Sequence, residues 1–250
     1  MASQEQKIAL VTGAGSGIGA ASARALSAAG FTLVLTGRRV ARLLETGESC
    51  TGLTVEIESD VSDPESVKNL FAGIESEFSR LDVLFNNAGG GSRPAPIDEI
   101  SVEDWQRVIN VNLTGTFLCS RSAFKLMKNQ QPMGGRIINN GSISAHAPRP
   151  GSAPYTASKH AITGLTKSTS LDGRPYNIVC GQIDIGNALT EMTARMGDGV
   201  PQADGSIQPE PTMDVDHVGA AVAQMAALPL ESNIQFMTIM ASKMPLIGRG

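Results

Sequence analysis

Residues 12–19 read Thr12-Gly13-Ala14-Gly15-Ser16-Gly17-Ile18-Gly19, and this stretch decides the fold. It follows a short apolar run at residues 7–11 and precedes an Ala-rich segment that ends at Gly30. Glycines between a buried strand and a helix let the backbone approach a pyrophosphate closely, and the helix N-terminus offers it free N–H groups. The alternative is a strand–helix turn that binds nothing. The context favours a phosphate-binding loop.

Apolar runs and helical patterns alternate along the rest of the chain. Strands are expected at about residues 7–11, 31–36, 53–57, 81–86, 136–140, 176–182 and 235–240. Helices are expected at 18–29, after the capping sequence at 62–65, from Ser101 to about Lys128 with Trp105 and Val108 inside, and at 153–171. Such alternation builds parallel sheets with right-handed crossovers. The sequence therefore predicts an α/β fold, a doubly wound Rossmann-type parallel sheet of about seven strands with helices on both faces.

No linker, repeat or low-complexity tract divides the 250 residues, so a single domain over residues 1–250 is expected. Residues 186–212 stand apart because they are rich in Gly and Pro and show little periodicity. A long irregular segment in a compact domain is usually functional or disordered.

Composition excludes several classes of partner. The formal net charge of −4 argues against a nucleic-acid surface. No run of eighteen apolar residues exists, so no membrane partner is expected, and the early first strand leaves no room for a signal peptide. Cys50, Cys119 and Cys180 are scattered without metal-ligand spacing, as in reduced cytoplasmic proteins. No metal site is expected.

Tyr155 and Lys159 lie four residues apart, thirteen residues after Ser142. On a helix this spacing places the phenol and the ammonium on one face. A free tyrosine has a pKa of about 10 and is a poor acid or base at neutral pH, but a positive charge held beside a phenol favours the phenolate. An arbitrary Tyr-x-x-x-Lys is usually a surface pair. Behind a glycine-rich loop, the pair instead favours acid–base catalysis.

Together these motifs resemble the short-chain dehydrogenase/reductase family in its single-domain form. The matching residues are the glycine loop, Asp60-Val61, Asn86-Asn87-Ala88-Gly89, Asn112, Ser142, Tyr155 and Lys159, and the resemblance weakens after about residue 180. It implies an enzyme: an NAD(P)-dependent oxidoreductase that interconverts a carbonyl and a secondary alcohol by hydride transfer. A catalytically silent dinucleotide-binding sensor or scaffold is the alternative, because fold alone does not establish function.

The resemblance implies four catalytic residues, Asn112, Ser142, Tyr155 and Lys159. Ser142 and Tyr155 would hold the substrate oxygen, Tyr155 would donate or remove the proton, and Lys159 would also bind the ribose hydroxyls. Asn112 would sit at a helix irregularity that frees a carbonyl for a water beside Lys159. Ser144 is the competing serine. A triad of Ser142 with His146 or His160 lacks a suitably placed acid.

The residues expected to contact the dinucleotide are Thr12, Gly13, Ser16, Gly17, Ile18, Gly19, Arg38, Arg39, Asp60, Val61, Asn87, Ala88, Gly89, Tyr155, Lys159 and Ile185. NADP(H) is the expected cofactor, with NAD(H) possible. Folds that prefer NAD usually carry an acidic residue at the end of the second strand. Here Gly37 stands at that place and Arg38 follows, although Ser16 adds no basic residue to the loop, and Arg39 could instead begin the next helix.

Three further expectations rest on the resemblance. Residues 186–212, the lid segment, would cover a small-molecule carbonyl or alcohol substrate whose identity stays open. The family's Pro-Gly pair after strand six would correspond to Ile183 and Asp184, and the role of Asp184 is open. A homo-oligomer, dimer or tetramer, would form through the helices that begin near Ser101 and Pro154 and through residues 234–244.

Overall fold

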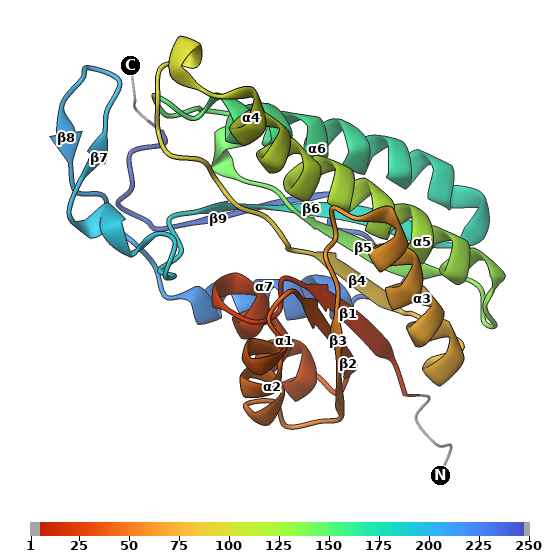
Figure 1. Ribbon diagram of the computed structural model, residues 1–250. Helices are drawn as coiled ribbons and strands as arrows, with labels where there is room; N and C mark the ends of the chain where they lie inside the picture. Colours follow the sequence, from red (N-terminus) through yellow and green to blue (C-terminus); the bar gives the residue numbers. More distant parts are fainter. Residues whose placement is uncertain (1–5, 248–250) are drawn as a thin grey trace.

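The computed structural model describes residues 6–247, and its centre is a seven-stranded parallel sheet between two layers of helices (Figure 1). The strand order is β3-β2-β1-β4-β5-β6-β9. The predicted fold class is confirmed. The predicted domain bounds, 1 to 250, include residues 1–5 and 248–250, which lie outside the described residues.

The strands fall close to the expected positions, with one exception. Their bounds are β1 Ile8–Thr12, β2 Thr32–Gly37, β3 Thr54–Glu58, β4 Val83–Asn86, β5 Gly135–Asn140, β6 Ile178–Gly186 and β9 Phe236–Met240. The exception is β6, which continues four residues beyond the predicted end at 182. From β1 the chain moves outward to β3, then returns to β4 on the other side of β1. Open sheets of this kind bind ligands outside the carboxyl ends of the strands at this reversal.

Helices cover both faces of the sheet. One face carries α1 Gly17–Ala28, α2 Val40–Glu48 and α7 Val215–Ala227, and the other carries α3 Pro64–Phe78, α4 Val102–Ile109, α5 Gly115–Asn129 and α6 Ala153–Gly173 (Figure 1). Each layer buries its own apolar cluster against the sheet. The helix α7 was not expected from the sequence, although Asp214 caps it by accepting from the Asp216 N–H. None of the helices within residues 6–247 has the length and apolar character needed to cross a bilayer.

The long helix expected from Ser101 to about Lys128 is interrupted. A π-helix at Asn110–Thr114 separates α4 from α5. Asn, Val and Thr are weak helix formers, and such π-bulges are frequent at functional sites. The irregularity predicted at Asn112 is therefore confirmed. The inward position predicted for Trp105 is wrong, because α4 packs on α6 and leaves Trp105 41% exposed.

The lid segment has more structure than its composition predicted. It contains a short helix, η5 Ala194–Gly197, and an antiparallel pair, β7 Val200–Pro201 with β8 Ile207–Gln208. Its two ends are joined, since the Leu189 N–H donates to the Met213 carbonyl at 2.8 Å and the Met213 N–H donates to Asn187 at 2.9 Å. The segment lies beyond the carboxyl ends of the strands (Figure 1).

Candidate functional site

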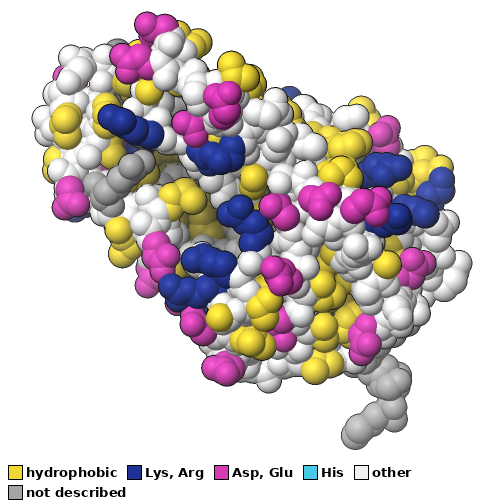
Figure 2. Space-filling model, in the orientation of Figure 1, with side chains coloured by type: hydrophobic (Ala, Val, Ile, Leu, Met, Phe, Trp, Pro, Cys, Tyr) yellow, Lys and Arg dark blue, Asp and Glu magenta, His cyan; other side chains and the backbone are white. Residues whose placement is uncertain are grey.

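A cavity of about 730 Å³ opens at the carboxyl ends of the central strands. The glycine loop, the ends of β2 to β6, the start of α6 and the lid segment all line it. Figure 2 shows the hollow on the left half of the molecule, with Lys and Arg side chains at its rim. Within residues 6–247, no three His, Cys, Asp or Glu side chains gather closely enough to hold a metal ion.

The glycine loop joins β1 to α1 and forms one wall. Gly13 has a φ of +63°, and a Cβ there would lie 2.9 Å from the Ala88 Cα, so only glycine fits. Ser16 precedes α1 but its side chain makes no capping bond. The first N–H groups of a helix lack partners within the helix, and such a terminus attracts anions. A pyrophosphate therefore fits this wall.

The residues predicted for the adenine end also line the cavity. Arg38, Arg39, Asp60 and Val61 lie there, at the ends of β2 and β3. Burial alone would raise the pKa of Asp60, but hydrogen bonds from the Ser62 side chain and backbone, and the charge of Arg38, outweigh it and lower that pKa. Arg39 precedes α2 as its N-terminal flanking residue, as the sequence analysis allowed.

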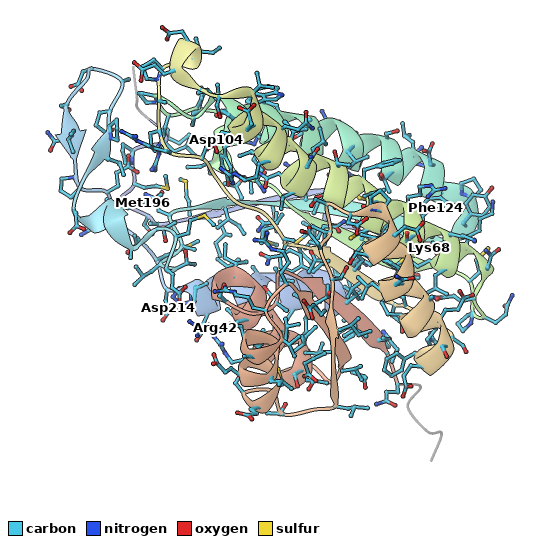
Figure 3. All side chains as sticks on the ribbon, viewed as in Figure 1. Arg42, Lys68, Asp104, Phe124, Met196 and Asp214 are labelled. Atoms are coloured by element: carbon cyan, nitrogen blue, oxygen red, sulfur yellow. The ribbon has the colours of Figure 1, made fainter. Side chains whose placement is uncertain are left out.

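Arg42, in the first turn of α2, was not predicted but lines the cavity. It pairs with Glu45 at 2.9 Å and with Glu191 of the lid segment at 3.7 Å. Figure 3 labels Arg42 on α2 and, above it in this view, Met196 of η5, which also lines the cavity. Arg42 comes three residues after Arg39, at the start of the helix that follows β2, and this short spacing is the signal in the sequence that indicates it.

Ser142, Tyr155 and Lys159 line the other end of the same cavity. Ser142 follows β5, and its Oγ accepts from the Ser144 N–H at 3.1 Å. Tyr155 and Lys159 lie on successive turns of α6, with the Lys159 Nζ 5.5 Å from the centre of the Tyr155 ring. The Lys159 Nζ also donates to the Asn140 carbonyl at 2.6 Å. Sequence reasoning missed Asn140 because it acts through its backbone.

Three predicted residues brace the cavity without lining it. Thr12 Oγ1 accepts from the N–H groups of Asn87 and Ala88, each at 3.0 Å. A Cβ on Gly19 would lie 2.2 Å from the Gly13 carbonyl oxygen, so Gly19 allows close packing of the loop.

Asn112 is the third bracing residue, and it is buried. Its side chain accepts from the Gly90 N–H and donates to the Gly90 carbonyl, each at 2.9 Å, and also donates to Ser158 at 3.1 Å. Its own carbonyl accepts from the Thr116 hydroxyl at 2.8 Å. Asn112 therefore shapes the cavity through the glycines that follow β4 and through α6.

The strand β6 does not end before Ile183 and Asp184, as was expected. Ile183 and Asp184 lie inside the strand and are buried, whereas Ile185 and the residues that follow β6 line the cavity. Strands of a parallel sheet are buried on both faces and usually read as continuous apolar runs. Asp184 interrupts that pattern although it lies inside β6. The predicted place of Ile185 at the cavity agrees with the structure. The expectation that no acid is suitably placed is wrong for His146, because the Asp184 Oδ2 lies 3.0 Å from the His146 Nε2. A triad still does not form, since the Ser142 Oγ accepts from the Ser144 N–H and, within residues 6–247, is not hydrogen-bonded to His146 or His160, whose ring faces the Thr156 carbonyl.

Comparison with known proteins identifies the family of this chain. The family model for short chain dehydrogenases matches residues 7–200. The chain belongs to the short-chain dehydrogenase family. It is 40% identical over 194 residues to a 3beta-hydroxysteroid dehydrogenase of Mediterraneibacter gnavus, covering 76% of this chain and 69% of that protein. It is 30% identical over 240 residues to sulfoacetaldehyde reductase 2 of Chromohalobacter salexigens, covering 94% of each.

Solved structures of oxidoreductases have the same fold as this chain. A 3-ketoacyl-(acyl-carrier-protein) reductase from Brucella melitensis, complexed with NADH, superposes with a TM-score of 0.85 at 25% identity, covering 96% of this chain and 99% of that one. A metagenomic short-chain oxidoreductase in complex with NADP gives a TM-score of 0.81 at 27% identity, with the same coverage. The chain is thus an oxidoreductase of the class that acts on CH–OH and C=O groups, and its family uses nicotinamide dinucleotides.

Proposed function

We propose that this enzyme interconverts a carbonyl and a secondary alcohol with NADP(H), and that Tyr155 is its acid and base. One observation carries the proposal: Ser142, Tyr155 and Lys159 share a single cavity with the glycine loop. The bound dinucleotide supplies or accepts the hydride. The protein supplies the proton and a site for the substrate oxygen.

Each of the three side chains has a separate task. The Ser142 hydroxyl and the Tyr155 phenol hold the substrate oxygen and stabilise the charge that develops there. Tyr155 gives its proton to that oxygen in reduction and removes it in oxidation. Lys159 places a positive charge beside the ring, and its bond to the Asn140 carbonyl fixes that charge. Asn112 links the segment after β4 to the helix that carries Tyr155 and Lys159, because its side chain bonds to Gly90 and to Ser158 of α6.

The chain's residues fit a dinucleotide, and the adenine end supports NADP(H). A Cβ on Gly37 would meet only Leu43, at 3.5 Å, so no acidic side chain stands where a 2′-phosphate would lie. Arg38 is exposed beside the cavity, and its charge acts on Asp60. A guanidinium can meet a phosphate with two parallel charged hydrogen bonds. Arg39 and Arg42 add positive charge nearby.

The remaining expectations complete the proposal. The chain works as one domain, and the lid segment closes over the substrate. It assembles as a dimer or tetramer in the cytoplasm, with α4, α5 and α6 in one interface and residues 234–244 in a second contact. Trp105 and Phe117 support this interface, because they expose 41% and 48% of their surface on these helices.

The test is turnover of a carbonyl and alcohol panel with NADPH, NADH and their oxidised forms. The panel includes a 3-hydroxysteroid, a 3-ketoacyl thioester and sulfoacetaldehyde, since relatives are named for such compounds. Oxidation of NADPH with a matching amount of alcohol product supports the proposal. Tight dinucleotide binding without turnover of any compound would favour the silent sensor.

A further inference from the structure

A buried acidic residue accepts a hydrogen bond from the backbone of Ser142, the serine of the proposed mechanism. Asp184 belongs to β6 and is 1% exposed, between the apolar residues Ile183 and Ile185. Burying a carboxyl group is costly unless hydrogen bonds satisfy it. An apolar side chain would fill this strand position more simply, so the contacts of Asp184 are informative.

The two oxygens of Asp184 hold the two ends of one short turn. Its Oδ1 accepts from the Ser142 N–H at 2.9 Å, and its Oδ2 lies 3.0 Å from the His146 Nε2. Ser142 precedes the 3-10 turn Ile143–Ala145 and His146 follows it. A single carboxyl group therefore clamps the segment that presents the serine hydroxyl to the cavity.

The neighbouring residues are adapted to this clamp. A Cβ on Gly141 would lie 2.0 Å from the Asp184 Oδ1 and 2.7 Å from the Gln182 Nε2, so the carboxyl group occupies the space of a side chain at position 141. Gln182 donates to the Asp184 Oδ1 at 2.7 Å and to Thr163 of α6 at 3.1 Å. The clamp is thus tied to the helix that carries Tyr155 and Lys159.

We propose that Asp184, with His146, is a positioning residue that sets the place of the Ser142 hydroxyl relative to Tyr155. The proposal rests on the proposed function. Asp184 does not line the cavity, so it acts through the Ser142 backbone. Misplacing a reacting group by about 1 Å can cost about a hundredfold in rate. Loss of the clamp should therefore lower kcat while the dinucleotide still binds, because Asp184 bonds to Ser142, His146 and Gln182 and not to the glycine loop.

The test compares Asp184→Ala, Asp184→Asn and His146→Ala, using the best substrate of the panel. His160→Ala is the matched control for the histidine, since the His160 ring is exposed and faces the Thr156 carbonyl within α6. Asp184→Ala should lower kcat at least about tenfold and leave the NADPH Kd within about twofold. Asp184→Asn keeps an oxygen for the Ser142 N–H and should recover part of the loss. His146→Ala should lower kcat several-fold, and His160→Ala should leave it unchanged.

A double-mutant cycle separates positioning from a general loss of stability. In a Ser142→Ala background, adding Asp184→Ala should lower kcat no further, because residues that act as a unit are not additive. An equal loss in both backgrounds would overturn the proposal, as would unchanged kcat in a variant with a lowered Tm. If Asp184→Ala fails to fold, Asp184→Asn and His146→Ala decide the outcome. A wild-type enzyme that turns over no compound would overturn the proposed function, and the positioning role with it.

Discussion

The Lys159 ammonium nitrogen lies 5.5 Å from the centre of the Tyr155 ring and 2.6 Å from the Asn140 carbonyl oxygen. Tyr155 and Lys159 come from one face of α6, and Asn140 ends β5. The position of the positive charge relative to the phenol is therefore set by two packed elements. Asn140 also donates to Asn87 at 3.0 Å, which ties this end of the cavity to the glycine loop.

Replacing Tyr155 by Phe should remove turnover and leave folding intact. Only the hydroxyl is lost, so Tm and the NADPH Kd should hardly change. Proton transfer by a positioned side chain contributes about 10²- to 10⁴-fold, and we expect a loss in kcat of that order. Tyr176 is the chain's other tyrosine and contacts Phe124 and Lys128, away from the cavity, so Tyr176→Phe is the control. Near-normal activity of Tyr155→Phe would refute the assigned role.

Replacing Lys159 by Met should weaken cofactor binding and slow the chemical step together. The buried ammonium serves both the ribose hydroxyls and the Tyr155 phenol in the proposed mechanism. Dinucleotide titration and single-turnover rates at saturating NADPH separate the two effects. Lys167→Met is the control, since Lys167 lies over the ring of Phe236. A change in affinity alone would show that Lys159 only binds cofactor.

The residues that line the cavity show what the sequence could predict. The order of strands and helices placed the glycine loop, Ser142 and Tyr155 at one edge of the sheet, because carboxyl ends of parallel strands meet there. Asn140 could not be found, since any residue can offer a carbonyl. The Asp184 clamp could not be found either, because it depends on the space left by Gly141, which follows the neighbouring strand β5. The burial of Trp105 was predicted wrongly, because helical periodicity does not show which side of α4 packs on α6 and which side stays exposed.

Without ligand, the lid segment should exchange its amide hydrogens faster than the central strands. Its large apolar side chains Leu189, Met192 and Ile207 are exposed, so they contribute little burial that would hold it in place. Cofactor and substrate together should slow exchange over residues 189–212. Hydrogen-exchange mass spectrometry provides the measurement. Protection equal to that of β1 and β4 in the free enzyme would argue against a lid.

Thiol reagents should leave the enzyme active. Burial raises the pKa of Cys119 and of Cys180 to about 12, and it also raises the pKa of the half-buried Cys50. Because the thiolate is the reactive form, at pH 8 a thiol with such a pKa is only about one part in ten thousand thiolate. Iodoacetamide labelling, followed by mass spectrometry and activity, should show Cys50 reacting first and no loss of turnover. Reactivity should rise as the pH is raised. Rapid inactivation at neutral pH would contradict this.

The cofactor preference can be tested in both directions at the end of β2. Arg38→Ala should weaken NADPH binding at least about tenfold while NADH binding hardly changes, because one charge-assisted contact to the 2′-phosphate is lost. Gly37→Asp should lower the ratio of NADPH to NADH affinity further. An aspartate there can accept from a ribose hydroxyl and repels a phosphate, and its Cβ would meet Leu43 at an ordinary 3.5 Å.

Lys68→Ala is the control for the cofactor preference, since Lys68 lies on α3 and pairs with Glu65. Dissociation constants for both reduced dinucleotides decide the matter. Equal wild-type affinities, or a ratio that neither Arg38→Ala nor Gly37→Asp changes, would show that Gly37 and Arg38 do not select the cofactor.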